Sequence, residues 1–467
     1  MNTAATSARP VPAITDTTGA SATGTAHAAQ KGGYGVGPSP ISRLVWVTVL
    51  TGVGAGIGGM ALALLLHAIQ HLAYGYSLDR LIGGPSFYAG VSASSPERRV
   101  AVLAACGLVA GLGWYAVYRF AKPLVSIKKA IGANDPRMPV VATVSHALLQ
   151  IVTVALGSPL GREVAPREIG STFAGWLSWR AGLSVEESRV MVACGAGAGL
   201  AAVYNVPLGG AVFVLEVLLG TFSLPVLIPA LATSVIAALV AWIGLGDESQ
   251  YTVPHFALNA SLVTWSVIAG PAFGVAAFGF SQITQHARKH AARGWALPVL
   301  SVINFAAIGM LAIYLPQLLG NGKTPAQLGF DSMIGIGLAA VLLVMKVAIT
   351  VSSLRAGAEG GLLTPGLSNG ALLAIVLGGL WTLVWPGTPL GAFAIIGATA
   401  FLASSMNMPI TAIVLMSEFT HIDHDFLVPM LLAVAGSVAV NRLCANWLKQ
   451  RQGTRSNGSI AQSVVAG

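Results

Sequence analysis

Long apolar segments follow one another along most of the chain, with short polar or glycine-rich stretches between them. They cover residues 44–74, 100–120, 139–157, 189–219, 223–244, 261–283, 295–319, 333–353, 370–386, 390–404 and 427–448. A helix needs about 20 apolar residues to cross a bilayer, and several of these segments are shorter or are interrupted by Gly and Pro. The pattern predicts an all-α polytopic membrane protein whose helices are short, broken and closely packed.

The composition agrees with a membrane protein. Of the 467 residues, 55% are hydrophobic and only 9% are charged, whereas soluble domains carry roughly 25% charged residues. So few charges cannot cover a water-facing surface of this size, which excludes a soluble enzyme of two or three domains. The 56 glycines lie mostly inside runs of Leu, Val and Ala, which excludes a collagen-like repeat.

The two ends of the chain differ from its apolar middle. Residues 1–42 are rich in Ala, Thr, Ser, Gly and Pro and are predicted to form a disordered tail, not a signal peptide. Residues 43–450 form the predicted transmembrane domain. Residues 451–467 are polar and are predicted to be a short cytoplasmic tail with no regulatory domain after it.

The basic residues lie at the ends of the apolar segments. The formal net charge is +9, and the positive-inside rule explains it without a nucleic-acid partner. Placing the basic groups in the cytoplasm puts both termini there as well. The three cysteines, Cys106, Cys194 and Cys444, lie in apolar stretches without CxxC spacing, so neither a disulfide framework nor a metal site is expected.

The chain contains an internal repeat. Residues 195–207 recur as residues 397–409, an offset of 202 residues that the following Glu216 and Glu418 also keep. The two halves run from about 43 to 245 and from about 258 to 450. A glycine-rich turn ending in proline precedes each copy, at 161–166 and 360–365. Duplication without functional content is the alternative, but matching helix breaks in duplicated membrane halves favour a transport site.

An arginine and a glutamate stand in the first of these turns. Arg162 and Glu163 lie in an apolar neighbourhood at a helix start, where ionisable groups are costly and are usually paired or functional. Glycine and proline leave backbone N–H groups unpaired at the helix N-terminus, which favours an anion site. A neighbouring carboxylate is able to occupy such a site and to leave it when protonated.

The sequence resembles the CLC family of chloride channels and chloride/proton exchangers over nearly all of residues 43–450. The run GREVAPREIG is similar to the family's GREGP motif, and AEGGLLTP is similar to its GGxFxP motif. Val164 and Ala165 stand where the family has Gly and Pro. The resemblance implies a prokaryotic CLC-type inverted-repeat fold of short, broken and tilted helices. It also implies anion selectivity, a homodimer with one pore per subunit, and a bacterial inner (plasma) membrane location.

The resemblance also assigns candidate site residues. Glu163 falls on the family's external gating glutamate. Backbone amides that would face the anion fall on Gly161, Arg162, Val164, Leu362, Leu363 and Thr364. The expected partners are therefore chloride or another small anion, protons and the lipid bilayer, with no cofactor.

Two inner contacts of the family are missing. The family's GSGIP motif is absent, and Lys122 falls near the position of its serine, with Ala121 or Pro123 as the alternatives one residue away. Lys122 is thus a possible inner selectivity position, and the preference for chloride over other halides or nitrate is left open. The family's late tyrosine falls near Gln450.

A third departure concerns protons. The proton-handling glutamate of family exchangers follows another glutamate, but here Val217 follows Glu216. Valine cannot accept a proton, which favours a passive anion channel gated by Glu163. An anion/proton antiporter for chloride, fluoride or nitrate is the alternative, because some exchangers also lack this glutamate.

Other signals favour structural roles. The glycines of residues 52–59 favour close helix packing over a phosphate loop. The equivalent repeat positions of Glu216 and Glu418 favour a structural role in helix packing or capping over catalysis. Irregular spacing favours a solvated turn over a metal site for His421, Asp423, His424 and Asp425. Trp176, Trp179, Trp242, Trp381 and Trp385 favour interfacial anchoring. No HExxH or GxSxG motif supports an intramembrane enzyme.

Overall fold

The computed structural model describes residues 33–35, 37–77 and 82–465, and it describes side chains up to residue 451. The first half contains α1 (Ile41–Tyr74), α2 (Phe87–Ala93), α3 (Pro96–Phe120), α4 (Ile127–Ile131), α5 (Val140–Ala155), α6 (Val164–Ala181), α7 (Val185–Tyr204), α8 (Pro207–Phe213), a π-helical turn (Val214–Leu219) and α9 (Leu224–Leu245). The second half contains α10 (Ala260–Lys289), α11 (Ala296–Tyr314), α12 (Lys323–Phe330), α13 (Ile336–Arg355), α14 (Leu363–Trp381), α15 (Leu390–Ser405), α16 (Pro409–Thr420) and α17 (Leu427–Val465).

All secondary-structure elements assigned in the described part of the chain are helices, as the apolar pattern predicts. Eight of its helices are long and apolar enough to cross a membrane. Shorter apolar helices, such as α5, α15 and α16, lie between them. The protein is thus an all-α, multi-pass membrane protein in which shorter apolar helices stand among the full-length spans.

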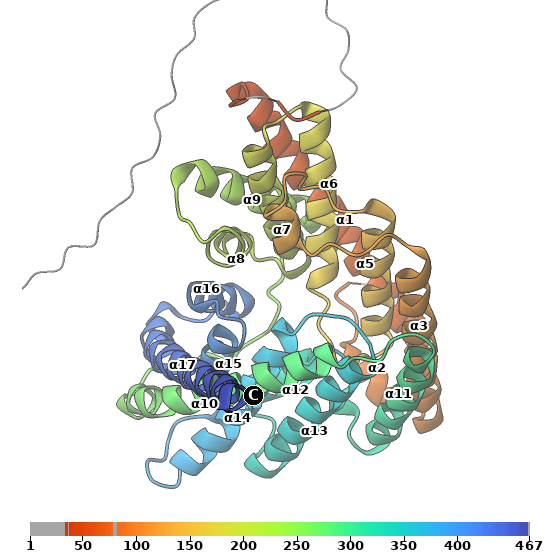
Figure 1. Cartoon of the computed structure of the whole chain (residues 1–467). Coiled ribbons are helices and arrows are strands. Elements are labelled where there is room, and N and C mark those ends of the chain that lie inside the picture. Colours follow the sequence, from red (N-terminus) through yellow and green to blue (C-terminus); the bar gives the residue numbers. More distant parts are fainter. Residues whose placement is uncertain (1–32, 36, 78–81, 466–467) are drawn as a thin grey trace, which may run out of the picture.

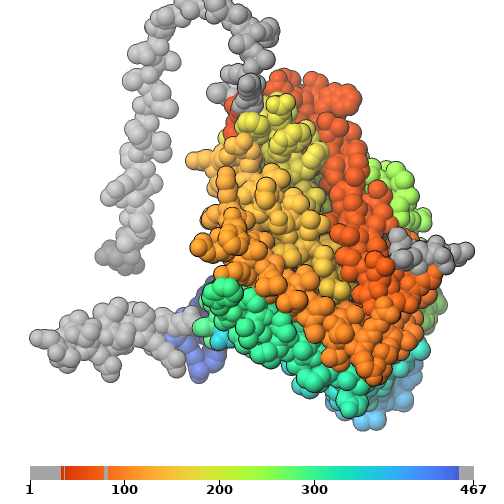
Figure 2. Space-filling view, turned by 90° about the vertical axis from the view of Figure 1, so that its right-hand side faces the viewer, coloured from red at the N-terminus to blue at the C-terminus, as the bar shows by residue number. Residues whose placement is uncertain are grey.

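The two halves lie against each other along one broad boundary. In Figure 1 the first half occupies the upper part of the view and the second half the lower part, with α3 beside α11 and α8 above α16. The space-filling view shows them as one continuous body (Figure 2).

The repeated Asn-x-Pro motif breaks a helix at the same place in each half. Asn205 ends α7 with φ 55°, and Asn407 follows α15 with φ 53°. Asparagine tolerates this left-handed conformation better than most residues, and the proline two residues later starts the next helix. The repeat in the sequence is therefore a repeat of helix breaks.

Glu216 and Glu418 join the halves by capping helices reciprocally. Glu216 accepts the backbone N–H groups of Ile410 and Thr411 at 3.0 and 2.7 Å, at the start of α16. Glu418 accepts those of Leu208 and Gly209 at 2.9 and 2.6 Å, at the start of α8. Each carboxylate thus satisfies free donors at a positive helix end of the other half. The capping role expected for both residues is confirmed.

Glycine allows α6 and α7 to cross closely. A Cβ atom on Gly170 would collide with the carbonyl of Gly195, and one on Gly195 would collide with the carbonyl of Gly170. Small residues let helix backbones approach in membranes, where packing rather than water exclusion drives association. The excess of glycine in the chain is partly explained by such crossings.

The chain ends differ from the predicted boundaries. Residues 1–32 of the expected tail lie outside the described residues. Ser39, by contrast, bonds the carboxylate of Glu187 through both its backbone N–H and its hydroxyl. At the other end α17 continues to Val465, so the expected tail after residue 450 extends a helix.

Candidate functional site

The two glycine-rich turns meet at the boundary between the halves. Gly161 donates its N–H to the carbonyl of Gly361 at 2.8 Å, and Gly361 donates to Gly161 at 2.9 Å. This pair is an isolated antiparallel bridge. Because α6 begins at Val164 and α14 at Leu363, the bridge brings two helix N-termini together. Both present backbone donors and positive dipole ends, which favour a negative charge between them.

The side chain of Glu163 lies at this point. It is 0% exposed, and its Oε1 accepts the backbone N–H of Leu363 at 2.7 Å. Its other oxygen, Oε2, has no hydrogen-bond partner among the described residues. A carboxylate of the first half thus occupies the helix N-terminus of the second half.

Arg162, in the same turn, lines a cavity of about 720 Å³. Its guanidinium lies 5.2 Å from the ring centroid of Tyr204, whose hydroxyl is 3.3 Å from Thr364 Oγ1. Lys323 and Trp242 also line this cavity, and Trp242 donates its indole N–H to Asn205 Oδ1. The cavity thus reaches Arg162, the residue before Glu163, whereas Glu163 itself is buried beyond its lining.

Arg167 holds the turn from inside. Its Nε donates to the backbone carbonyl of Glu163 at 2.8 Å, and its guanidinium lies 5.1 Å from the ring centroid of Phe213. Arg167 is only 9% exposed. The cation therefore fixes the backbone of Glu163 and adds positive potential beside it.

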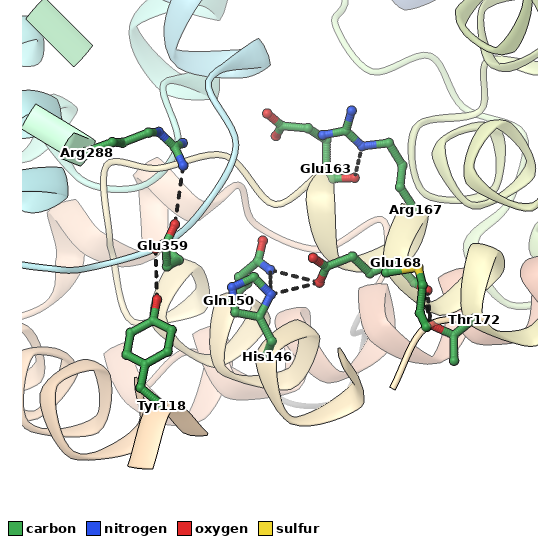
Figure 3. A network of polar contacts seen from close by, with 10 residues as sticks. Tyr118, His146, Gln150, Glu163, Arg167, Glu168, Thr172, Arg288 and Glu359 are labelled. Atoms are coloured by element: carbon green, nitrogen blue, oxygen red, sulfur yellow. Dashed lines mark hydrogen bonds and ion pairs between the residues drawn. The ribbon is translucent and has the colours of Figure 1, made fainter. Parts of the chain in front are cut away.

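A second polar cluster lies between α5 and α6 (Figure 3). The Nδ1 atom of His146 is 2.9 Å from Glu168 Oε2, and Gln150 Nε2 donates to the same oxygen at 3.2 Å. All three residues are buried. No motif or repeat marks these three residues as a site. The one local signal is His146, an ionisable residue inside the apolar segment 139–157.

A third group surrounds Glu359 at the turn before α14. Tyr118 donates its hydroxyl to Glu359 Oε1 at 2.9 Å, and Arg288 contacts Glu359 Oε2 at 3.3 Å (Figure 3). Arg288 also donates to the carbonyl of Gly360 at 2.7 Å. These contacts tie α3 and α10 to the turn that presents the Leu363 amide.

The backbone amides predicted to face an anion have different hydrogen-bond partners and positions in the structure. Leu363 donates to Glu163, whereas the amide of Gly161 is not directed at an ion because it is used in the bridge with Gly361. Val164 is the first residue of α6, and Leu362 caps α14.

Lys122 and Val217, the two positions at which the sequence departs from the family pattern, belong to other elements than these turns. Lys122 is exposed in the connection between α3 and α4, and Ser126, four residues later, caps α4 by accepting the N–H of Lys129. Val217 lies in the π-helical turn and packs against the apolar core. A role of Lys122 in selectivity stays a prediction.

The residues weighed as metal ligands form no such site. Among the described residues no group of three or more His, Cys, Asp and Glu side chains is arranged to hold a metal. Asp423 instead pairs with His255 at 2.7 Å on the surface.

The chain is similar to known proteins along most of its length. The family described as "Voltage gated chloride channel" matches residues 106–442. A putative chloride channel protein, ClcB-like, from Ralstonia nicotianae is 30% identical over 72% of this chain and 80% of its own. The H(+)/Cl(-) exchange transporter ClcA of Vibrio vulnificus is 26% identical over 87% of this chain and 88% of its own. The solved structure of a slow cyanobacterial Cl-/H+ antiporter has the same fold, with a TM-score of 0.74, 18% identity and coverage of 90% of this chain and 100% of the other.

Proposed function

We propose, since this chain belongs to the voltage-gated chloride channel family, that it carries chloride or a similar small anion along a pathway that Glu163 closes. Members of this family are channels or transporters, so the chain is an anion transport protein and not an enzyme. The contact between Glu163 Oε1 and the Leu363 amide carries the proposal.

Protonation of Glu163 opens this pathway. As a carboxylate, Glu163 is held by the N–H of Leu363 and by the positive helix ends beside it, which favour negative charge. As a neutral acid it loses this attraction, and a transported anion competes for the same donors. The anion takes the place of the carboxylate, with Leu362, Leu363, Thr364, Val164 and the Arg162 backbone as the proposed donors. Lys122 is the proposed inner selectivity position.

Two transport modes are consistent with this gate. Passive conduction is favoured by Val217, which cannot accept a proton where family exchangers carry a glutamate. Anion/proton exchange, for chloride, fluoride or nitrate, is the second candidate, and the buried His146–Glu168 pair favours it. A homodimer in a bacterial inner (plasma) membrane, with both termini in the cytoplasm, completes the proposal.

Flux measurements on purified protein in liposomes test the gate. A chloride gradient is imposed, and chloride efflux is followed with an ion-selective electrode between pH 4.5 and pH 8 (about the range over which a perturbed carboxyl titrates). We expect wild-type flux to rise as the pH falls. Glu163→Gln imitates the neutral acid and is expected to give flux that no longer depends on pH.

The matched control is Glu186→Gln, which alters a carboxylate whose side chain is 79% exposed on α7. It is expected to keep the wild-type pH dependence. Retained pH dependence in Glu163→Gln overturns the gating role, and the absence of anion flux in the wild type overturns the transport function.

A further inference from the structure

We infer that His146 and Glu168 form an internal proton-transfer site that exchanges protons with Glu163, and that anion transport by this chain is therefore coupled to proton movement. The inference rests on the proposed gating role of Glu163. It assigns the proton chemistry to α5 and α6 rather than to the π-helical turn that carries Val217.

The first support is the composition of the cluster. Glu168 Oε2 is 2.9 Å from His146 Nδ1, and the two side chains are 11% and 10% exposed. A buried carboxylate and imidazole in hydrogen-bond contact can hold one proton on either partner. Burying such a pair in a membrane span is costly unless it is used or fully satisfied.

The second support is that the cluster is not fully satisfied. Gln150 Oε1 and Trp114 Nε1 have no hydrogen-bond partner among the described residues, and both side chains are 0% exposed. Trp114 packs edge-on against His146, with ring centroids 6.4 Å apart. Buried polar groups are normally paired with protein groups or with ordered water. We infer that water bonded to these two atoms carries the proton.

The third support is a link from the cluster to the gate. Glu163 and Glu168 stand at the start of the same helix, five residues or roughly 7.5 Å of helix rise apart. Arg167 lies between them in sequence and interacts electrostatically with both carboxylates. Arg167 therefore stabilises a negative charge on either Glu163 or Glu168, which favours transfer of a proton from one carboxyl group to the other.

The fourth support is a partly exposed carboxylate at the turn before α14. Glu359 is 23% exposed, so it is reached by water. In the view of Figure 3, His146 and Gln150 are drawn between Glu359 and Glu168.

Helices α1, α3 and α7 pack on α5 and α6. The histidines on α1, His67 and His71, line the cavity of Arg162, and Tyr118 on α3 bonds Glu359. The charged groups on α7 are bonded elsewhere, Glu186 to Arg189 and Glu187 to Ser39 and Ser184. On α6 itself, Arg167 and Glu163 are the charged neighbours of Glu168. Within this packing, His146 and Glu168 are the ionisable pair in direct contact.

The proton leaves the hydrogen-bonded His146–Glu168 pair and passes through water to a carboxylate oxygen of Glu163. Glu163 becomes neutral and releases the Leu363 N–H, while the pair becomes more negative by one charge. Glu163 then gives this proton to water in the cavity lined by Arg162, and the pair takes up a new proton from the opposite side. Each completed cycle therefore moves one proton past the site that the anion uses.

Simultaneous proton and anion measurements in liposomes test the inference. A chloride gradient is imposed, chloride is followed with an electrode, and pH is followed with an external dye. We expect the wild type to move protons against the chloride flow. Glu168→Gln keeps the size and hydrogen-bonding shape of the side chain, and we expect it to lower proton movement about 100-fold, the scale of losing a positioned acid–base group. Chloride flux should persist.

Two further variants separate proton transfer from folding. Glu168→Asp retains a titratable group and is expected to restore part of the proton movement. His146→Gln changes the other partner of the pair and is also expected to lower proton movement. It tests the inference independently if Glu168→Gln does not fold. Glu186→Gln is the control and should leave both fluxes unchanged.

The outcomes distinguish this inference from the gating role. Wild-type proton movement in Glu168→Gln or in His146→Gln overturns the proton-transfer site. Chloride flux without proton movement in the wild type also overturns it, whereas the gating role then still stands if Glu163→Gln abolishes the pH dependence. Retained pH dependence in Glu163→Gln overturns the gate itself.

Discussion

Gly161 and Gly361 exchange both of their backbone hydrogen bonds, at N···O distances of 2.8 and 2.9 Å, beside the carboxylate of Glu163. The bridge fixes the spacing of the two turns, one from each half. It also leaves no room for a side chain, because a Cβ atom on either glycine would overlap the Glu163 carboxylate. The position of the Glu163 side chain therefore requires glycine at both residue 161 and residue 361.

Gly361→Ala is expected to displace Glu163. The added methyl group takes space now held by the carboxylate, and the end of a flexible side chain yields more easily than the bridged backbone. We expect chloride flux at neutral pH to rise severalfold and to depend less on pH, on the scale of about 1 kcal/mol for one misplaced group. Liposome efflux at pH 7 and at pH 5 measures this.

Gly279→Ala is the matched control for that substitution. Gly279 lies in α10, and a Cβ atom there meets nothing within 4 Å. This variant should keep the wild-type flux and pH response. A pH response of Gly361→Ala equal to that of the wild type would contradict the proposed position of Glu163.

Glu418→Ala is expected to destabilise the contact between α8 and α16. The substitution removes the acceptor for the N–H groups of Leu208 and Gly209. The Gly209 donor is partly buried and the Leu208 donor is exposed, so we expect a loss of about 1 kcal/mol, the lower end of the cost of an unpaired donor. Denaturant or thermal unfolding of the purified protein in detergent should show this loss.

The equivalent cap in the other half of the chain allows an independent test. Glu216→Ala removes the acceptor for Ile410 and Thr411, and we expect a loss of similar size. Glu418→Gln and Glu216→Gln keep one acceptor oxygen and should lose less. Equal stability of the wild type and both alanine variants would show that these caps do not hold the halves together.

Asp135 is expected to anchor the segment before α1 in a pH-dependent way. Hydrogen bonding to Arg137 holds the pKa of Asp135 well below its usual range, and the hydroxyl of Tyr34 adds to this effect. A carboxyl whose pKa is depressed by folding stabilises the folded state above its unfolded pKa of about 3.9 and loses this contribution as the pH falls. Because its side chain is 51% exposed, the contribution is about 0.2–1 kcal/mol.

Asp135→Asn tests this anchor by hydrogen exchange. At pH 7 the variant should exchange the amides of residues 33–35 faster than the wild type does. At pH 3 the difference should shrink, because this pH lies below the unfolded pKa of about 3.9 and protonation of the Asp135 carboxyl in the undocked state begins to offset the stabilisation. Equal exchange of both proteins at pH 7 would rule out the anchor.

Much of the site was predictable because its signals are local. Glycine and proline mark the helix breaks, and one glutamate beside them stands out in an apolar turn. Both Asn-x-Pro motifs and their following glutamates keep the offset of the repeat. What the sequence did not reveal is the use of the Gly161 amide in a bridge, since that depends on a turn 200 residues away.

The proton-transfer site lay beyond sequence reasoning for the same reason. His146 and Glu168 are 22 residues apart and belong to different helices, and Tyr118 meets Glu359 across 241 residues. Their contacts depend on how each helix is rotated about its axis and where it crosses its neighbours. Isolated residues such as Glu168 carry no periodic or repeated pattern that would report this.

The sequence by itself determined that the chain is a multi-pass helical membrane protein of two similar halves, with broken helices and a candidate gate at Glu163. Apolar length, helix-breaking residues and repetition are properties of neighbouring positions, so they can be read along the chain. Tertiary structure alone decided which donor Glu163 meets, which helix each capping glutamate serves and which buried acid lies near the gate. These contacts arise from packing between distant segments, which no local pattern specifies.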